Sequence, residues 1–97
     1  MSIIRMIHTT FPPAMSAQAE RNWKEKCAPL MIQQHGCLSE RLLRCGDVPG
    51  EYISYSEWET EESIRVYLRS EAHREIKRLN TNIQGAHVVV KMYEEVS

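Results

Sequence analysis

The segment from Tyr52 to His73, YISYSEWETEESIRVYLRSEAH, constrains the fold most because it combines a strand with two successive helix starts. Alternate residues of an extended strand share a face, and here one face carries Tyr52, Ser54, Ser56 and Trp58. Thr60 and Ser70 can accept hydrogen bonds at a helix N-terminus, and glutamate follows each of them. The segment therefore predicts a strand, ending at Trp58, that leads into a bent, two-part helix.

A bend in the helix layer leaves space above the strand that it covers. Ile64, Tyr67 and Leu68 follow at helical spacing in the first part, and His73 lies in the first turn of the second part. We therefore expect a pocket beside Trp58, Tyr67 and His73.

The N-terminal part of the chain predicts a strand followed by an amphipathic helix. Ile3–Thr10 is largely apolar on both strand faces, which is typical of a strand that is covered on both sides. A helix is expected from a cap at Ser16 to the neighbourhood of His35, with Gly36 as the left-handed residue that closes it. Pro29 predicts a kink late in this helix because proline removes a backbone hydrogen bond. The apolar face carries Ala19, Trp23, Cys27 and Leu30.

The remaining segments predict a hairpin, a link and a final strand. Cys37–Cys45 alternates as a strand, and the turn at Asp47–Gly50 joins it to the Tyr52 strand. Asn80–Gly85 reads as a polar link, and Ala86–Val96 as a strand with an apolar centre. The order β-α-β-β-α-α-β predicts an α+β, ferredoxin-like fold with helices on one face of a four-stranded antiparallel sheet. Because strands are apolar on both faces, the other sheet face is expected to meet a second copy in a two-fold homodimer.

Length, charge and cysteine usage exclude several classes of protein. The 97 residues predict a single domain, residues 1–97. A net charge of −1 with scattered basic residues argues against nucleic acid or a membrane surface as partner. No apolar run approaches the roughly 20 residues of a membrane span, so a cytoplasmic protein is expected. The odd set Cys27, Cys37 and Cys45 lacks a C-x-x-C motif, which predicts reduced thiols and no metal site.

Several motifs together resemble one known family. They are Y-S-E-W-E at the end of the hairpin, the acidic helix start after it, Y-L-R-S-E-A-H, H-G-C before the second strand, and a W-x-x-x-x-S/A core. Over Ile3–Val96 the chain resembles the antibiotic biosynthesis monooxygenase domain family of the dimeric α/β-barrel superfamily. The resemblance implies a dimeric α/β barrel with a pocket between each sheet and its helices. It also implies a cofactor-independent monooxygenase that oxidises a small aromatic or quinone-type metabolite with molecular oxygen, without metal, flavin or haem.

Such a reaction needs a base that converts the substrate into an electron-rich anion, and a dry pocket. His73 is one candidate base because it lies at the rim of the core face of its helix; a capped or solvated histidine is the alternative. His8 shares a strand face with Ile4 and Met6, so it is a second candidate if that face meets the helices. Otherwise His8 is a core or dimer-interface histidine.

Three further residues are expected to line the substrate pocket. Trp58 would form an aromatic wall, although an inward tryptophan at a strand end is more often a core residue. Tyr67 would supply a phenolic hydrogen bond, although packing explains its position equally well. Ser54 stands four residues before the tryptophan, where some family members place a polar site residue. Some members also use an arginine on the last helix, but helical phase turns Arg78 away from the core face, so that role is not transferred.

Two other functions remain open alongside the monooxygenase. A non-catalytic dimer that binds a small ligand in the same pocket is favoured by the departures at Ser54 and Arg78. A haem-binding or haem-degrading relative is third. Such relatives place an iron-ligating histidine where Lys77 stands, and an asparagine on the first strand, which has none between Ser2 and Phe11. No cofactor is therefore expected, and the sequence leaves open whether the chain is an enzyme.

Overall fold

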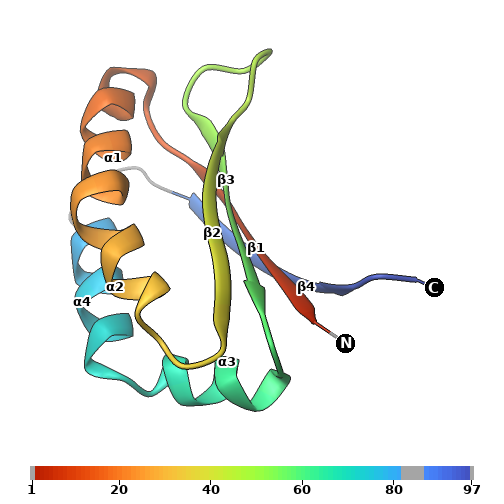
Figure 1. The fold of residues 1–97 in the computed structure, drawn as a ribbon. Helices are drawn as coiled ribbons and strands as arrows, with labels where there is room; N and C mark the ends of the chain where they lie inside the picture. The colour runs from red at the N-terminus through yellow and green to blue at the C-terminus, as the bar shows by residue number, and fades with distance from the viewer. Residues whose placement is uncertain (1, 82–86, 97) are drawn as a thin grey trace.

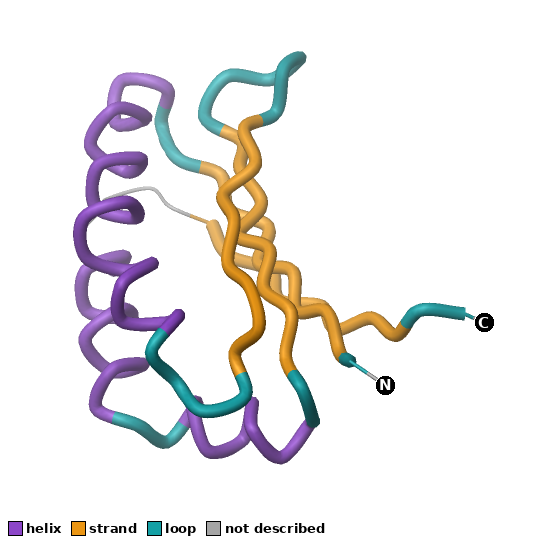
Figure 2. Tube along the Cα trace, viewed as in Figure 1, coloured by secondary structure: helices purple, strands orange, loops and turns teal. Residues whose placement is uncertain are grey.

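The protein folds as a layer of helices on one face of a sheet, as the computed structural model shows for residues 2–81 and 87–96 (Figures 1 and 2). The four-stranded sheet has the order β2-β3-β1-β4, and each neighbouring pair is antiparallel. Its strands are β1 (Ile3–Thr10), β2 (Cys37–Arg44), β3 (Glu51–Trp58) and β4 (His87–Glu94). The helices are α1 (Ser16–Asn22), α2 (Ala28–Ile32), α3 (Glu61–Leu68) and α4 (Glu71–Thr81). The predicted α+β, ferredoxin-like fold is confirmed.

The first helical stretch differs in detail from the prediction. Met15, not Ser16, occupies the N-cap position of α1, after a 3₁₀ turn at Pro13–Met15. The expected disturbance near Pro29 lies just before it, as a π-helical turn over Trp23–Cys27 that separates α1 from α2. Proline has no N–H and its ring crowds the carbonyl four residues earlier. The preceding turn therefore forms hydrogen bonds of the wider π-helical type. The helix ends at Ile32 rather than near His35.

Glycine at position 36 makes the return from α2 to β2 feasible. Gly36 has φ of +85°, as expected, and an added Cβ would lie 2.2 Å from Ser63 Oγ on α3. Only glycine combines this backbone conformation with so close an approach. The first turn of α3 therefore rests directly on the α2–β2 connection.

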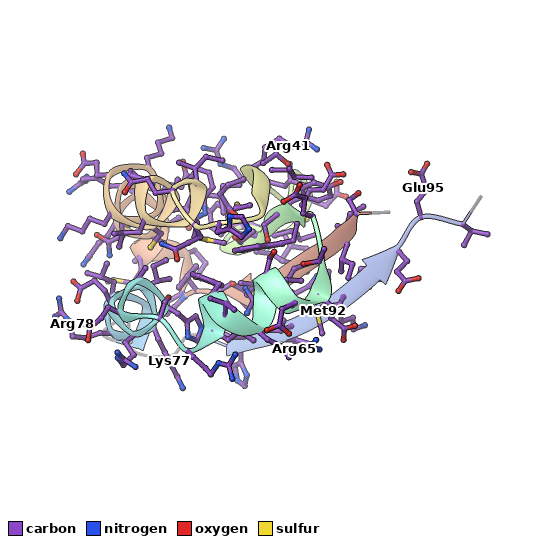
Figure 3. All side chains as sticks on the ribbon, turned by 60° about the horizontal axis from the view of Figure 1, so that its bottom comes forward. Arg41, Arg65, Lys77, Arg78, Met92 and Glu95 are labelled. Atoms are coloured by element: carbon purple, nitrogen blue, oxygen red, sulfur yellow. The ribbon has the colours of Figure 1, made fainter. Side chains whose placement is uncertain are left out.

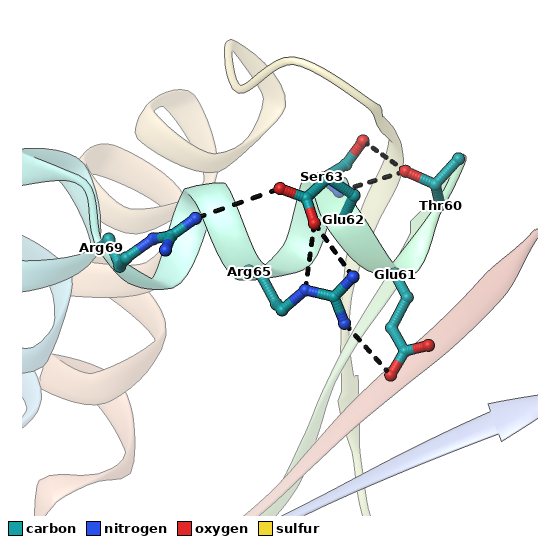
Figure 4. Close-up of polar contacts among 6 residues, drawn as sticks. All are labelled: Thr60, Glu61, Glu62, Ser63, Arg65 and Arg69. Atoms are coloured by element: carbon teal, nitrogen blue, oxygen red, sulfur yellow. Dashed lines mark hydrogen bonds and ion pairs between the residues drawn. The ribbon is translucent and has the colours of Figure 1, made fainter.

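The two caps predicted for the bent helix are confirmed. Thr60 Oγ1 accepts a hydrogen bond from the backbone N–H of Ser63 at 3.1 Å (Figure 4). Ser70 Oγ accepts one from the backbone N–H of His73, also at 3.1 Å. On the exposed side of α3, Arg65 pairs with Glu62. These caps fix the bend between α3 and α4, and the bend places α3 across the end of the sheet (Figure 1).

Strand register decides which side chains face the helices. On β1 the inner face carries Ile3, Arg5, Ile7 and Thr9, which pair with Trp58, Ser56, Ser54 and Tyr52 of β3. Two buried hydrophobic clusters lie between the layers. The larger consists of Cys27, Met31, Trp58, Ile64, Tyr67, Ile76 and Leu79, and the smaller of Phe11, Ala19 and Tyr52.

The last strand is exposed on both faces. Val88 and Val90 on its inner face are 53% and 46% exposed, and Val89 on its outer face is 52% exposed. Helix α4 extends through Thr81, so it includes the start of the predicted link, and residues 82–86 lie outside the described part of the chain. An apolar strand that is open on both sides is typical of a surface that another molecule covers.

Candidate active site

A cavity of about 720 Å³ lies between the inner face of the sheet and the helices. Its wall draws on both hydrophobic clusters and on the inner face of β4. Among the apolar residues that line it are Ile7, Phe11, Met31, Leu42, Ile76 and Val90. Among the polar residues that line it are Arg5, Glu20, Ser54, Tyr67, His73 and Lys77. A cavity of this size and character is typical of small-molecule sites.

The structure brings together three of the five site residues predicted from the sequence. Ser54, Tyr67 and His73 all line the cavity. The cavity reaches the bent helix through Tyr67 and His73, and it extends along the sheet beyond the bend.

Trp58 does not line this cavity. Its side chain is fully buried, its ring centroid lies 5.1 Å from that of Tyr67, and Nε1 donates to Ser56 Oγ at 2.9 Å. The indole therefore supports Tyr67 from behind, as a core residue, while Tyr67 presents the aromatic surface to the cavity.

His8 lies on the other face of the sheet. It pairs with Ile53 of β3 and Val89 of β4, and the alternation of β1 turns this face away from the helices. The condition under which His8 would be a candidate base, that its face meets the helices, is not met. Its Nε2 atom is buried and has no hydrogen-bond partner within residues 2–81 and 87–96.

Arg5 is a cavity residue that the sequence analysis missed. It is only 5% exposed, and its guanidinium carbon lies 6.0 Å from the centroid of the Tyr67 ring. Burial lowers the pKa of Arg5, while Tyr67 and Glu40 act in the opposite direction. An arginine nevertheless stays protonated at neutral pH. The cavity thus contains a fixed positive charge in an apolar wall.

Glu40 on β2 is the second residue that was missed. Its Oε1 atom accepts hydrogen bonds from Trp23 Nε1 at 3.2 Å and from Ser54 Oγ at 2.8 Å. Its Oε2 atom is buried without a hydrogen-bond partner among the described residues. Burial raises the pKa of Glu40 from 4.5 to about 7, because it outweighs these hydrogen bonds and the attraction of Arg5. Near neutral pH this carboxyl group can therefore either hold or accept a proton.

His73 presents a neutral imidazole to the cavity. Burial, and then the positive charge of Arg5, lower its pKa, and only a hydrogen bond with the Leu68 backbone opposes them. The ring stands edge-on to Tyr67, with centroids 5.2 Å apart and an interplanar angle of 74°. Burial raises the pKa of Tyr67, so its phenol stays protonated and can donate a hydrogen bond.

Two other residues of α4, Lys77 and Arg78, differ in whether they face the cavity. Lys77 lines the cavity. Arg78 is exposed and donates to Glu75 Oε1 at 2.5 Å, and it projects at the periphery of the molecule (Figure 3). Among the described residues, no three His, Cys, Asp or Glu side chains are grouped so that they could hold a metal ion. No described helix is long and apolar enough to cross a membrane.

Comparison with known proteins identifies the family. The family model for antibiotic biosynthesis monooxygenases matches residues 2–79, and the chain belongs to this family. No curated protein sequence matches the chain. Among solved structures, a cofactor-independent oxygenase from Streptomyces nogalater, SnoaB, is 14% identical with a TM-score of 0.79, covering 99% of this chain and 94% of that one. A conserved protein from Methanosarcina mazei is 20% identical with a TM-score of 0.82, over 99% and 95% of the two chains. At these identities the structures show a shared fold.

Proposed function

We propose that this protein is a cofactor-independent monooxygenase that oxidises a small aromatic or quinone-type metabolite in the cavity between sheet and helices. The observation that carries the proposal is the cavity itself, an apolar space of about 720 Å³ into which Arg5, Ser54, Tyr67 and His73 bring polar groups. Membership of the monooxygenase family supports it. SnoaB, which shares the fold, is a cofactor-independent oxygenase.

The proposed reaction converts a phenol into a quinone. The substrate first loses its hydroxyl proton, and the electron-rich anion then passes electrons to molecular oxygen. One oxygen atom becomes a ring carbonyl and the other leaves as water, so the substrate gives up four electrons and oxygen accepts them. In the cavity, Arg5 would stabilise the anion, Tyr67 would donate a hydrogen bond to it, and the apolar wall would exclude water. His73 remains the candidate base named from the sequence, and its neutral imidazole in the cavity supports that role.

The active form is proposed to be a homodimer in the cytoplasm that packs two sheets face to face. The outer sheet face carries Ile4, Met6 and Ile53, and Val89 and Tyr93 of β4 are 52% and 43% exposed. A partner sheet would bury this surface. Sedimentation of the purified protein should therefore give twice the monomer mass.

Oxygen uptake with a panel of hydroxylated naphthalenes and anthrones tests the function. We expect uptake together with formation of the corresponding quinone. Thr9 lines the cavity, so Thr9→Phe should fill part of it and strongly reduce uptake. Gln18→Phe places the same bulk on the exposed side of α1 and should retain uptake. No uptake across the panel, or equal effects of the two substitutions, would contradict the proposal.

A non-catalytic ligand-binding dimer is the second candidate. It is favoured by Ser54, a weaker hydrogen-bonding group than the resemblance implies before the tryptophan, and by the outward position of Arg78. Native mass spectrometry that finds a retained apolar ligand, in a protein that consumes no oxygen with it, would select this candidate.

A further inference from the structure

The hydroxyl group of Ser54 has a defined direction. Ser54 lines the cavity, and its single proton is donated to Glu40 Oε1 at 2.8 Å. A serine oxygen that donates its proton in one direction still has lone pairs to accept with. Towards the cavity, Ser54 therefore offers an acceptor for a substrate hydroxyl. This is the arrangement that a proton relay needs.

Glu40 is the group at the far end of this hydrogen bond. It faces the helices from β2, in one row with Ser56 of β3 and Arg5 of β1. With strands about 4.8 Å apart, the backbones of Glu40 and Arg5 are roughly 10 Å apart, and the positive charge of Arg5 acts to lower the pKa of Glu40. Glu40 Oε1 is held by Trp23 and Ser54, and Oε2 is buried without a partner among the described residues. The carboxylate is thus fixed in place but retains an unused acceptor.

Several charged and titratable side chains surround Glu40, and their protonation states decide what a change in pH can alter in this cluster. Cys27 and Cys37 have pKa values raised to about 11, with burial as the largest cause, so both thiols stay neutral. Tyr67 stays neutral and Arg5 stays positive, as described above. His73 is coupled to Arg5 and is neutral at pH 7. Glu40, with a pKa of about 7, is therefore expected to titrate between pH 6 and pH 8, and its titration has to be told apart from that of the nearby His73.

We infer that Glu40, in place of the sequence-predicted candidate His73, is the proton acceptor of this site and that Ser54 passes the substrate hydroxyl proton to it, beside the positive charge of Arg5. In this step the substrate O–H bond and the Ser54 O–H bond break. A new Ser54 O–H bond and a Glu40 O–H bond form. The negative charge moves from Glu40 to the substrate oxygen, where Arg5 stabilises it, and no oxidant is consumed. The ligands that fit are small aromatic molecules with an acidic hydroxyl group.

The inference rests on the proposed function for its role in turnover, but proton acceptance by Glu40 can be tested by binding alone. A dinitrophenol, which is anionic throughout the range, serves as the probe in the absence of turnover. Binding of an anion favours protonated Glu40, so the affinity of the wild-type protein should fall about tenfold between pH 6 and pH 8. Glu40→Gln should make the affinity nearly independent of pH. Ser54→Ala and His73→Gln should both keep the pH dependence.

Turnover then tests the relay. Glu40→Gln should lower kcat about 100-fold and remove the loss of activity below pH 7, because general base catalysis contributes on this scale. Ser54→Ala should lower kcat while keeping the pH dependence of probe binding. Glu25→Gln, an exposed carboxylate on the π-helical turn, is the matched control and should behave as the wild type.

The outcomes separate the two proposals. If no substrate is oxidised but the pH dependence of binding disappears only in Glu40→Gln, the monooxygenase proposal fails while Glu40 stands as the acceptor. If His73→Gln removes the pH dependence and Glu40→Gln keeps it, the inference is overturned. It is also overturned if the probe does not bind, or if Ser54→Ala leaves kcat unchanged.

Discussion

The buried carboxyl group of Glu40 should make the stability of this protein depend on pH in an unusual direction. Its pKa is raised on folding from 4.5 to about 7. A raised pKa means that the folded protein binds this proton more tightly than the unfolded chain, so the associated stability is fully present below pH 4.5. That stability is lost as the pH rises to about 7, and above this point it changes no further. At about 1.4 kcal/mol per pH unit, the loss amounts to about 3 kcal/mol.

Glu40→Gln removes the titration and is the perturbation of choice. The amide of the variant places a buried N–H₂ group near the position of Oε2, which has no hydrogen-bond partner among the described residues. This lowers the stability of the variant by the same amount at every pH. The quantity to measure is therefore the change with pH in the stability difference between variant and wild type. Other titrating groups, including Glu20, whose pKa Arg44 and Tyr52 hold at about 2, are common to both proteins and cancel.

Urea unfolding monitored by tryptophan fluorescence, at one protein concentration between pH 4.5 and pH 8.5, provides the assay. Relative to the wild type, the variant should gain about 3 kcal/mol across this range. In thermal unfolding this corresponds to a relative rise in Tm of roughly 12–24 °C for a domain of this size. Two curves that stay parallel within about 0.5 kcal/mol would refute the claim that Glu40 is buried as a titrating group.

Three further substitutions test the packing around the bent helix. Gly36→Ala should destabilise the protein by more than about 1 kcal/mol in urea unfolding, because the new Cβ meets Ser63 and φ is positive; an unchanged midpoint would contradict the close approach. Thr60→Ala should cost about 1 kcal/mol by the same assay, because the cap of α3 is lost, and Thr60→Ser should restore most of it. Trp58→Phe leaves Ser56 Oγ without its indole donor and creates a void, so about 2 kcal/mol should be lost. If Trp58→Phe instead altered ligand affinity without changing stability, the tryptophan would be part of the binding surface.

Local sequence signals were sufficient for most of the fold. Helix caps and strand alternation are short-range features, so Thr60, Ser70 and the inward face of β3 could be read directly from the sequence. The helix around Pro29 was harder. A proline predicts that the helical hydrogen bonds are disturbed. Whether the helix then kinks or forms a wider π-helical turn depends on the packing of the neighbouring turns.

The candidate site was only partly predictable because it depends on which sheet face the helices cover. Both faces of β1 are largely apolar, so pattern alone could not place His8 inside or outside. The sequence around Arg5 and Glu40 contains a pattern that marks them as candidate site residues. Each is a charged residue with leucine or isoleucine two positions away on both sides, so each interrupts an apolar strand face. Such a residue is either solvated or buried with partners, and only the three-dimensional structure shows that Glu40 meets Trp23 and Ser54.

Strand β4 pairs only with β1 in this sheet, and the pairing joins Ile3 to Glu94. During synthesis, the first strand leaves the ribosome long before the last one exists. Through that interval β1 can dock against β3, but its other edge remains open, with apolar side chains on both faces. Closing a long loop slows such contacts, and open strand edges are sites of intermolecular association. Arrival of β4 closes this edge of β1, but it moves the open edge to β4 itself, whose valines stay about half exposed.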